Sequence, residues 1–117
     1  MDSIIANGKK YVLESETSKN IDGLPYVMVR TYSAGVHCGY LDNKEGKEVT
    51  LLESIRIWKW EGAASLSQLS QEGTNSPDNC KFGMALKTRL FLTEAVEIIE
   101  MTTEAVENIK SVKSWKV

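Results

Sequence analysis

Two short segments hold the residues whose types suit ligand chemistry, and the first is residues 56–65, Arg-Ile-Trp-Lys-Trp-Glu-Gly-Ala-Ala-Ser. Indole rings stack on nucleobases, and a guanidinium group binds phosphate through two parallel hydrogen bonds. A helix expected to start near residue 65 would add unpaired N–H groups, which favour anions. This segment therefore suits a phosphorylated nucleotide, and its candidate ligand-binding residues are Arg56, Trp58, Trp60, Gly62, Ala63, Ala64 and Ser65.

The second segment is residues 30–37, Arg-Thr-Tyr-Ser-Ala-Gly-Val-His, which gathers hydrogen-bond donors around a glycine. Its candidate ligand-binding residues are Arg30, Thr31, Tyr32, Ser33 and His37. Both segments also have a purely structural interpretation. Two tryptophans at strand spacing often build a core, Ala63 and Ala64 allow close helix packing, and a polar turn between strands has a similar composition.

The usual signatures of catalysis are absent from the sequence. His37 is the one histidine, and its neighbour Cys38 should point to the opposite face of an expected strand, so the two do not form a nucleophile–base pair. Two distant cysteines, Cys38 and Cys80, and one histidine do not form a zinc motif, and without a secretory signal we expect two thiols, not a disulfide. No phosphate-binding or dinucleotide glycine fingerprint is present, and the glutamates of residues 94–107 suit a solvated face. We expect a protein that is not an enzyme and holds neither cofactor nor metal.

Size and charge narrow the class of protein further. A chain of 117 residues with 42% hydrophobic and 26% charged residues suits one globular domain, which we place at residues 25–117 after a variable segment, 1–24. With a net charge of −2, the protein lacks the positive field needed to bind duplex nucleic acid. Because the sequence has neither a membrane-length apolar stretch nor a signal peptide, we expect a cytoplasmic protein with no membrane partner.

The pattern of the chain predicts an α+β fold. Strand-like runs cover residues 26–32, 36–41, 47–52, 55–60, 86–92 and 95–99, and residues 36–52 form a hairpin with its turn at 42–46. Residues 93–100 also have helical propensity, but their β-branched content favours a strand, whereas residues 4–13 suit either a strand or a short helix. In the run 55–60, Arg56, Trp58 and Trp60 should share one face. The predicted architecture is a small antiparallel sheet of about five or six strands, a short helix after Gly62 that Ser65 caps, and a C-terminal helix that starts at Thr102 or Thr103.

Two longer stretches carry a resemblance to a known family. Residues 29–41, Val-Arg-Thr-Tyr-Ser-Ala-Gly-Val-His-Cys-Gly-Tyr-Leu, and residues 56–69, which begin Arg-Ile-Trp-Lys-Trp and end Ser-Leu-Ser-Gln-Leu, resemble a family of short phage and prophage proteins. Residues 79–82 and Trp115 extend this resemblance, which implies no reaction. In size and in its Arg, Trp and Gly residues before a helix, the chain is also similar to phage anti-defence proteins that sequester cyclic nucleotide immune signals, such as the Thoeris anti-defence sponges.

From the residues and these resemblances we expect a non-catalytic binding protein, a homo-oligomer in the host bacterial cytoplasm, that sequesters a phosphorylated, cyclic nucleotide signal for immune evasion. One alternative is a protein-interaction module in which exposed tryptophans bind and inhibit a host protein. Another is a binder of single-stranded nucleic acid, in which stacking outweighs the acidic net charge.

Overall fold

The computed structural model describes residues 23–117, so the predictions for residues 1–22 lie outside the described residues. In chain order, the strands and helices are β1 Tyr26–Thr31, β2 Val36–Glu45, β3 Glu48–Lys59, α1 Leu66–Glu72, the short 3-10 helix η2 Pro77–Asn79, β4 Lys81–Phe82, β5 Leu90–Leu92, β6 Ala95–Glu100 and α2 Thr103–Ser111. An antiparallel sheet of six strands with a central and a C-terminal helix confirms the predicted fold class.

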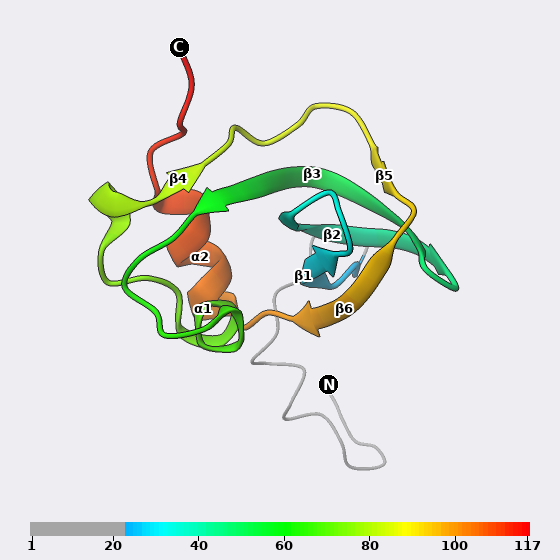
Figure 1. The fold of residues 1–117 in the computed structure, drawn as a ribbon, viewed down its shortest axis with the longest axis horizontal. Helices are drawn as coiled ribbons and strands as arrows, with labels where there is room; N and C mark the ends of the chain where they lie inside the picture. The colour runs from blue at the N-terminus through cyan, green and yellow to red at the C-terminus, as the bar shows by residue number, and fades with distance from the viewer. Residues whose placement is uncertain (1–22) are drawn as a thin grey trace.

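The sheet runs in the order β4-β3-β2-β1-β6, and β5 pairs with β3 (Figure 1). β2 and β3 form the predicted hairpin, although its turn is tighter than expected and lies at Gly46, whose φ of 59° suits glycine. β5 and β6 follow each other closely, yet β5 pairs with β3 whereas β6 pairs with β1. This bent segment therefore connects β3 and β1, which lie on opposite sides of β2.

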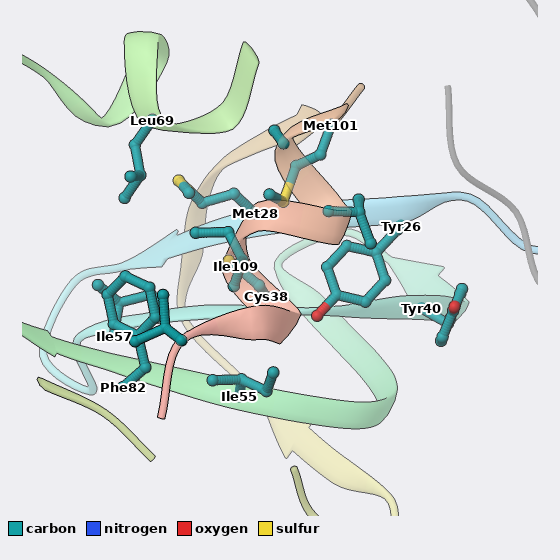
Figure 2. Packing of buried hydrophobic residues seen from close by; sticks show 13 residues of the cluster. Tyr26, Met28, Cys38, Tyr40, Ile55, Ile57, Leu69, Phe82, Met101 and Ile109 are labelled. Atoms are coloured by element: carbon teal, nitrogen blue, oxygen red, sulfur yellow. The ribbon is translucent and has the colours of Figure 1, made fainter. Parts of the chain in front are cut away.

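The larger core lies between one face of the sheet and the helices (Figure 2). Alternate strand residues such as Met28, Cys38 and Ile55 meet Leu69 of α1 and Ile109 of α2 there. A smaller cluster fills the space that β5 and β6 enclose on the other face, and its buried members are Val27, Val29, Val49, Leu51, Leu92 and Ala95. The two faces of the sheet therefore have separate apolar cores.

Both helices begin at the predicted caps. The hydroxyl of Ser65 accepts a hydrogen bond from the Gln68 N–H at 3.1 Å, and that of Thr102 accepts one from the Ala105 N–H at 3.1 Å. Within residues 23–117, neither helix has the length and apolar composition needed to cross a bilayer.

Several strands differ in extent from the prediction. Residues 47–52 and 55–60 belong to one long strand, β3, in which Glu53 has a φ of 53° and two residues oppose one at a β-bulge. Only residues 90–92 of the run 86–92 form a strand, whereas the short strand β4 was not predicted. Residues 95–100 form strand β6, as we expected.

Candidate functional site

The candidate site is a cavity of about 350 Å³ on the sheet face that points away from the helices, which we name the Trp58 pocket. Its wall on β3 is Ser54, Arg56 and Trp58, and His37 adds to it from β2. The segment after β4 runs beside β3, where the Gly83 N–H donates to the Arg56 carbonyl at 2.8 Å and the Leu86 N–H to that of Ser54 at 2.9 Å. The remaining wall comes from this segment, β5 and the C-terminal segment, through Gly83, Met84, Leu86, Leu90 and Trp115.

Arg56 is the cation of this pocket. Its guanidinium carbon lies 3.8 Å from the centroid of the Trp58 ring, a cation–π contact. Gly35, in the turn before β2, leaves room for the Arg56 guanidinium. A Cβ at this position would lie only 3.0 Å from one terminal nitrogen of Arg56. The Nε of Arg56 is buried without a hydrogen-bond partner, and no carboxylate within residues 23–117 pairs with this side chain. Arg56 is therefore a half-buried positive charge with free donors.

Two indole rings stand beside this cation. Trp58 and Trp115 pack edge to face, with ring centroids 6.0 Å apart and an interplanar angle of 68°. About half of each side chain is exposed, 52% for Trp58 and 51% for Trp115. The pocket therefore offers aromatic surface to a ligand.

His37 lies directly across the β2–β3 ladder from Arg56. Its Nε2 lies 2.9 Å from the carbonyl oxygen of Ala34, so this nitrogen donates the hydrogen bond. Burial lowers the pKa of His37 below its usual range, and the nearby charge of Arg56 lowers it further, while the bond to Ala34 opposes both effects. The imidazole is therefore neutral near neutral pH and leaves Arg56 as the positive charge on this wall.

Most polar side chains at the β1–β2 turn already have hydrogen-bond partners, either within the turn or on the segment of residues 94–97. The Thr31 hydroxyl donates to the Gly35 carbonyl at 2.7 Å and accepts from the Ala34 N–H at 2.8 Å. Arg30 donates through Nε to Glu97 at 3.0 Å, and Ser33 donates to Glu94 at 2.6 Å. Of the candidates in residues 30–37, the structure brings only His37 into the Trp58 pocket. Tyr32 is 82% exposed and lines neither this pocket nor its neighbours.

The prediction that Trp60 shares a face with Arg56 and Trp58 is wrong. Ile57 pairs with Phe82 and Lys59 pairs with Lys81, so β3 has one more residue than β4 at this point. Such a bulge shifts the alternation of side chains by one position. Trp60 consequently packs against the larger core, and its Nε1 donates to the Ala63 carbonyl at 3.3 Å.

The predicted anion site at the start of α1 is also not part of this pocket. The Ala64 N–H donates to the Gln68 side chain of α1 at 2.7 Å, so this donor is already occupied. Ala63 packs on the larger core. Gly62 has a φ of 86°, and a Cβ there would lie 2.6 Å from the Ser76 nitrogen. Gly62, Ala63, Ala64 and Ser65 therefore have packing and capping roles in this fold.

The thiols lie away from the pocket. Cys38 points into the larger core, opposite to His37, as predicted, and burial raises the pKa of its thiol. Cys80 is half-buried, with its sulfur 3.5 Å from the Glu61 carbonyl oxygen. Within residues 23–117, no three His, Cys, Asp or Glu side chains gather in a group able to hold a metal ion.

Comparison with known families finds one matching family model. The model of a family described as a domain of unknown function, DUF6948, matches residues 24–109. The chain belongs to the DUF6948 family. No curated protein and no solved structure matches it. The DUF6948 match includes Arg56 and Trp58, whereas Trp115, which completes the pocket, follows the matched residues.

Several pocket residues of this DUF6948 chain were not predicted as site residues: Ser54, Gly83, Met84, Leu86, Leu90 and Trp115. Gly35, which makes room for the Arg56 side chain, was not predicted either. For Trp115, a signal was present, because a tryptophan within the polar run 113–117 calls for a packing partner. Met84 and Leu86 join the site through backbone pairing with β3, which no local pattern indicates.

Proposed function

We propose that this chain is a non-catalytic binding protein that takes a phosphorylated nucleotide in the Trp58 pocket. The observation that carries this proposal is Arg56, a half-buried guanidinium that has an unpartnered Nε and forms no ion pair with any carboxylate of residues 23–117. The charge of this guanidinium has no carboxylate partner among residues 23–117, so an anion bound to its terminal nitrogens would supply a missing interaction. Arg30, in contrast, is satisfied by Glu97 on the exposed surface.

Shape and chemistry beside Arg56 favour a nucleotide over an inorganic anion. The volume of about 350 Å³ lies within the range of small-molecule pockets. Met84, Leu86 and the two indoles provide apolar and aromatic surface for a base, while Arg56 offers bidentate donors for a phosphate. These features together support a ligand that has both a ring and a phosphate.

The surroundings of His37 support binding without a reaction. Its Nε2 is committed to the Ala34 carbonyl, and Cys38 lies on the opposite face of β2. Nucleophilic catalysis needs a nucleophile and a base within hydrogen-bond reach, and these two side chains do not meet that condition. We therefore expect a bound nucleotide to be released intact when the protein is denatured.

The resemblance to phage proteins extends the proposal to a biological role, namely sequestration of a cyclic nucleotide immune signal in the bacterial cytoplasm. A pocket this open leaves one side of a ligand uncovered, so we also propose a homo-oligomer in which a second copy covers it. Sedimentation with and without nucleotide would test this assembly. A monomer in both conditions would contradict it.

Calorimetric titration of the intact protein with a panel of mononucleotides and cyclic nucleotides tests the proposed function. We expect Arg56→Ala to weaken binding by about 1.5–3 kcal/mol, the range for a lost charge-assisted hydrogen bond. Arg56→Lys should recover part of that loss, because it restores the charge but not the planar fork. Arg30→Ala is the matched control, since that arginine already has Glu97 as its partner.

Two results would refute the proposed function. One is that no nucleotide of the panel binds, and the other is that Arg56→Ala binds as well as the unaltered protein. Thermal melting without ligand separates the roles, because a large fall in the melting temperature of Arg56→Ala would assign the contacts with Trp58 and Gly35 a structural purpose.

The exposed apolar surface around the pocket favours a second candidate, a protein-interaction module. Trp58, Met84, Leu86 and Trp115 are all large, exposed and gathered at one cavity, and exposed aromatic patches mark protein interfaces. Under this alternative, Trp115→Ala would abolish capture of a host protein, whereas Arg56→Ala would leave it unchanged.

A further inference from the structure

A second cation lies on the far side of the tryptophan pair. The Nζ of Lys81, in β4, lies 5.0 Å from the centroid of the Trp115 ring, while Arg56 lies 3.8 Å from that of Trp58. The two rings contact each other with centroids 6.0 Å apart. The surface therefore has the order Arg56, Trp58, Trp115 and Lys81, with a positive charge at each end.

Among the described residues, neither Lys81 nor Arg56 forms an ion pair with a carboxylate. In the ladder between β3 and β4 it lies opposite Lys59, and like charges directly opposite each other are unfavourable. Lys59 forms an ion pair with Glu61, with 3.6 Å between Nζ and Oε2, but no carboxylate within residues 23–117 pairs with Lys81. An anion beside Lys81 would relieve the repulsion between the two lysines.

Trp115 also separates two hollows. One is the Trp58 pocket, and the other, of about 280 Å³, lies between the 3-10 helix η2 and the C-terminal residues. The side chains of Lys113 and Lys116 line this second hollow together with Asp78. A hollow with two lysines and one aspartate therefore continues the surface past Trp115.

We propose that the ligand carries two phosphate groups and spans Trp115, with one phosphate at Arg56 and the other at Lys81. Its chemical class is a dinucleotide, in which each hollow takes one base. This inference rests on the proposed function, because it assumes that the Trp58 pocket binds nucleotides. It deepens that function by naming a two-phosphate ligand in place of a mononucleotide.

The test compares adenosine monophosphate with the linear dinucleotide pApA, titrated calorimetrically into the intact protein at low ionic strength. We expect pApA to bind about tenfold more tightly, because it adds a second phosphate contact and a second base. Lys81→Met should weaken pApA by about fivefold, in keeping with a solvent-exposed charge, and leave the monophosphate unchanged. Arg56→Ala should weaken both ligands. Lys44→Met, in β2 but outside both hollows, is the matched control and should change neither.

The outcomes separate this inference from the function on which it rests. Equal affinities for the two ligands, with Lys81→Met silent, overturn the two-phosphate ligand and leave nucleotide binding intact. Failure of both ligands to bind overturns both proposals. Decathymidylate that binds far more tightly than pApA, with a steep loss of affinity at higher salt, would overturn the dinucleotide in favour of single-stranded nucleic acid.

Discussion

His37 remains neutral in the folded protein and leaves Arg56 as the charged side chain on this wall of the pocket. It is buried across from Arg56, and its Nε2–H donates to Ala34. Because burial, aided by the Arg56 charge, holds its pKa below the usual 6.5, the folded protein keeps the imidazole neutral under conditions where the unfolded chain binds a proton. The protonation of His37 is consequently linked to folding.

We predict that this linkage appears as a pH-dependent loss of stability. Between the lowered pKa and 6.5, the unfolded chain binds more protons than the folded one, so the free energy of unfolding rises with pH in that window. The contribution is fully present above about pH 6.5 and is lost as the pH falls toward the folded value. Urea unfolding of the unaltered protein and of His37→Gln, from about pH 5 to about pH 8, measures it. Parallel pH profiles for the two proteins would contradict this account.

At the scale of one element, β3 explains both what the sequence predicts well and where it fails. Alternation within residues 55–58 correctly predicts that Arg56 and Trp58 share a face opposite to Ile55 and Ile57. The bulges at Glu53 and near Trp58 change that alternation. For this reason we predicted two strands in place of β3 and assigned Trp60 to the wrong face. A bulge is defined by how two strands pair, and a single strand does not contain that information.

Short elements depend even more on distant partners. The two residues of β4 pair with β3, and Phe82 also forms a bridge with Ser114. Neither contact is local in sequence, so nothing in residues 81–82 alone indicates a strand. The capped helices α1 and α2, in contrast, carry their start signals within a few residues and were predicted correctly.

Alanine substitutions at two glycines with positive φ distinguish the cost of backbone strain from the cost of crowding. Gly62 has a φ of 86° and a Cβ there would meet Thr74, Asn75 and Ser76, whereas Gly46 has a φ of 59° and open space around it. We predict that Gly62→Ala lowers the free energy of unfolding by about 3 kcal/mol, since both the left-handed backbone and the crowding oppose a methyl group. Gly46→Ala, the control, should cost about 1 kcal/mol because it meets only the strain.

Chemical denaturation of both variants measures the difference. If the two alanine variants lost the same stability, the segment 74–76 would not pack on Gly62 in solution. A loss confined to Gly62→Ala would instead show that crowding dominates over backbone strain.

At the scale of the whole molecule, the β5–β6 segment joins β3 and β1, the two strands that flank β2. It pairs with β3 through residues 90–92 and with β1 through residues 95–100, and the smaller core fills the enclosed space. Composition and turn residues predict an α+β domain, and residues 95–99 indicate a strand. The strand order was not predictable, because it depends on pairings between residues that are far apart in the chain.

We predict that Leu92 supports this closure and that its neighbour Phe91 does not. Leu92 is buried in the smaller core, whereas Phe91 is 63% exposed on the other side of β5. Leu92→Ala should lower the free energy of unfolding by about 2–5 kcal/mol, the usual cost of a truncated core leucine. Phe91→Ala should change it by roughly 0.5 kcal/mol or less. Urea denaturation of the two variants gives the comparison, and similar losses would show that β5 does not close the sheet.

The edge-to-face packing of Trp58 and Trp115 gives the molecule an optical property of its own. Two indole chromophores with centroids 6.0 Å apart and planes at 68° share their electronic excitation. In a chiral setting, that sharing splits an absorption band into two circular dichroism components of opposite sign. The size and sign of this couplet depend on the angle between the rings, so a molecule that tilts Trp115 would alter the spectrum. The mouth of the pocket thus contains an intrinsic chiroptical reporter of the angle between its two indole rings.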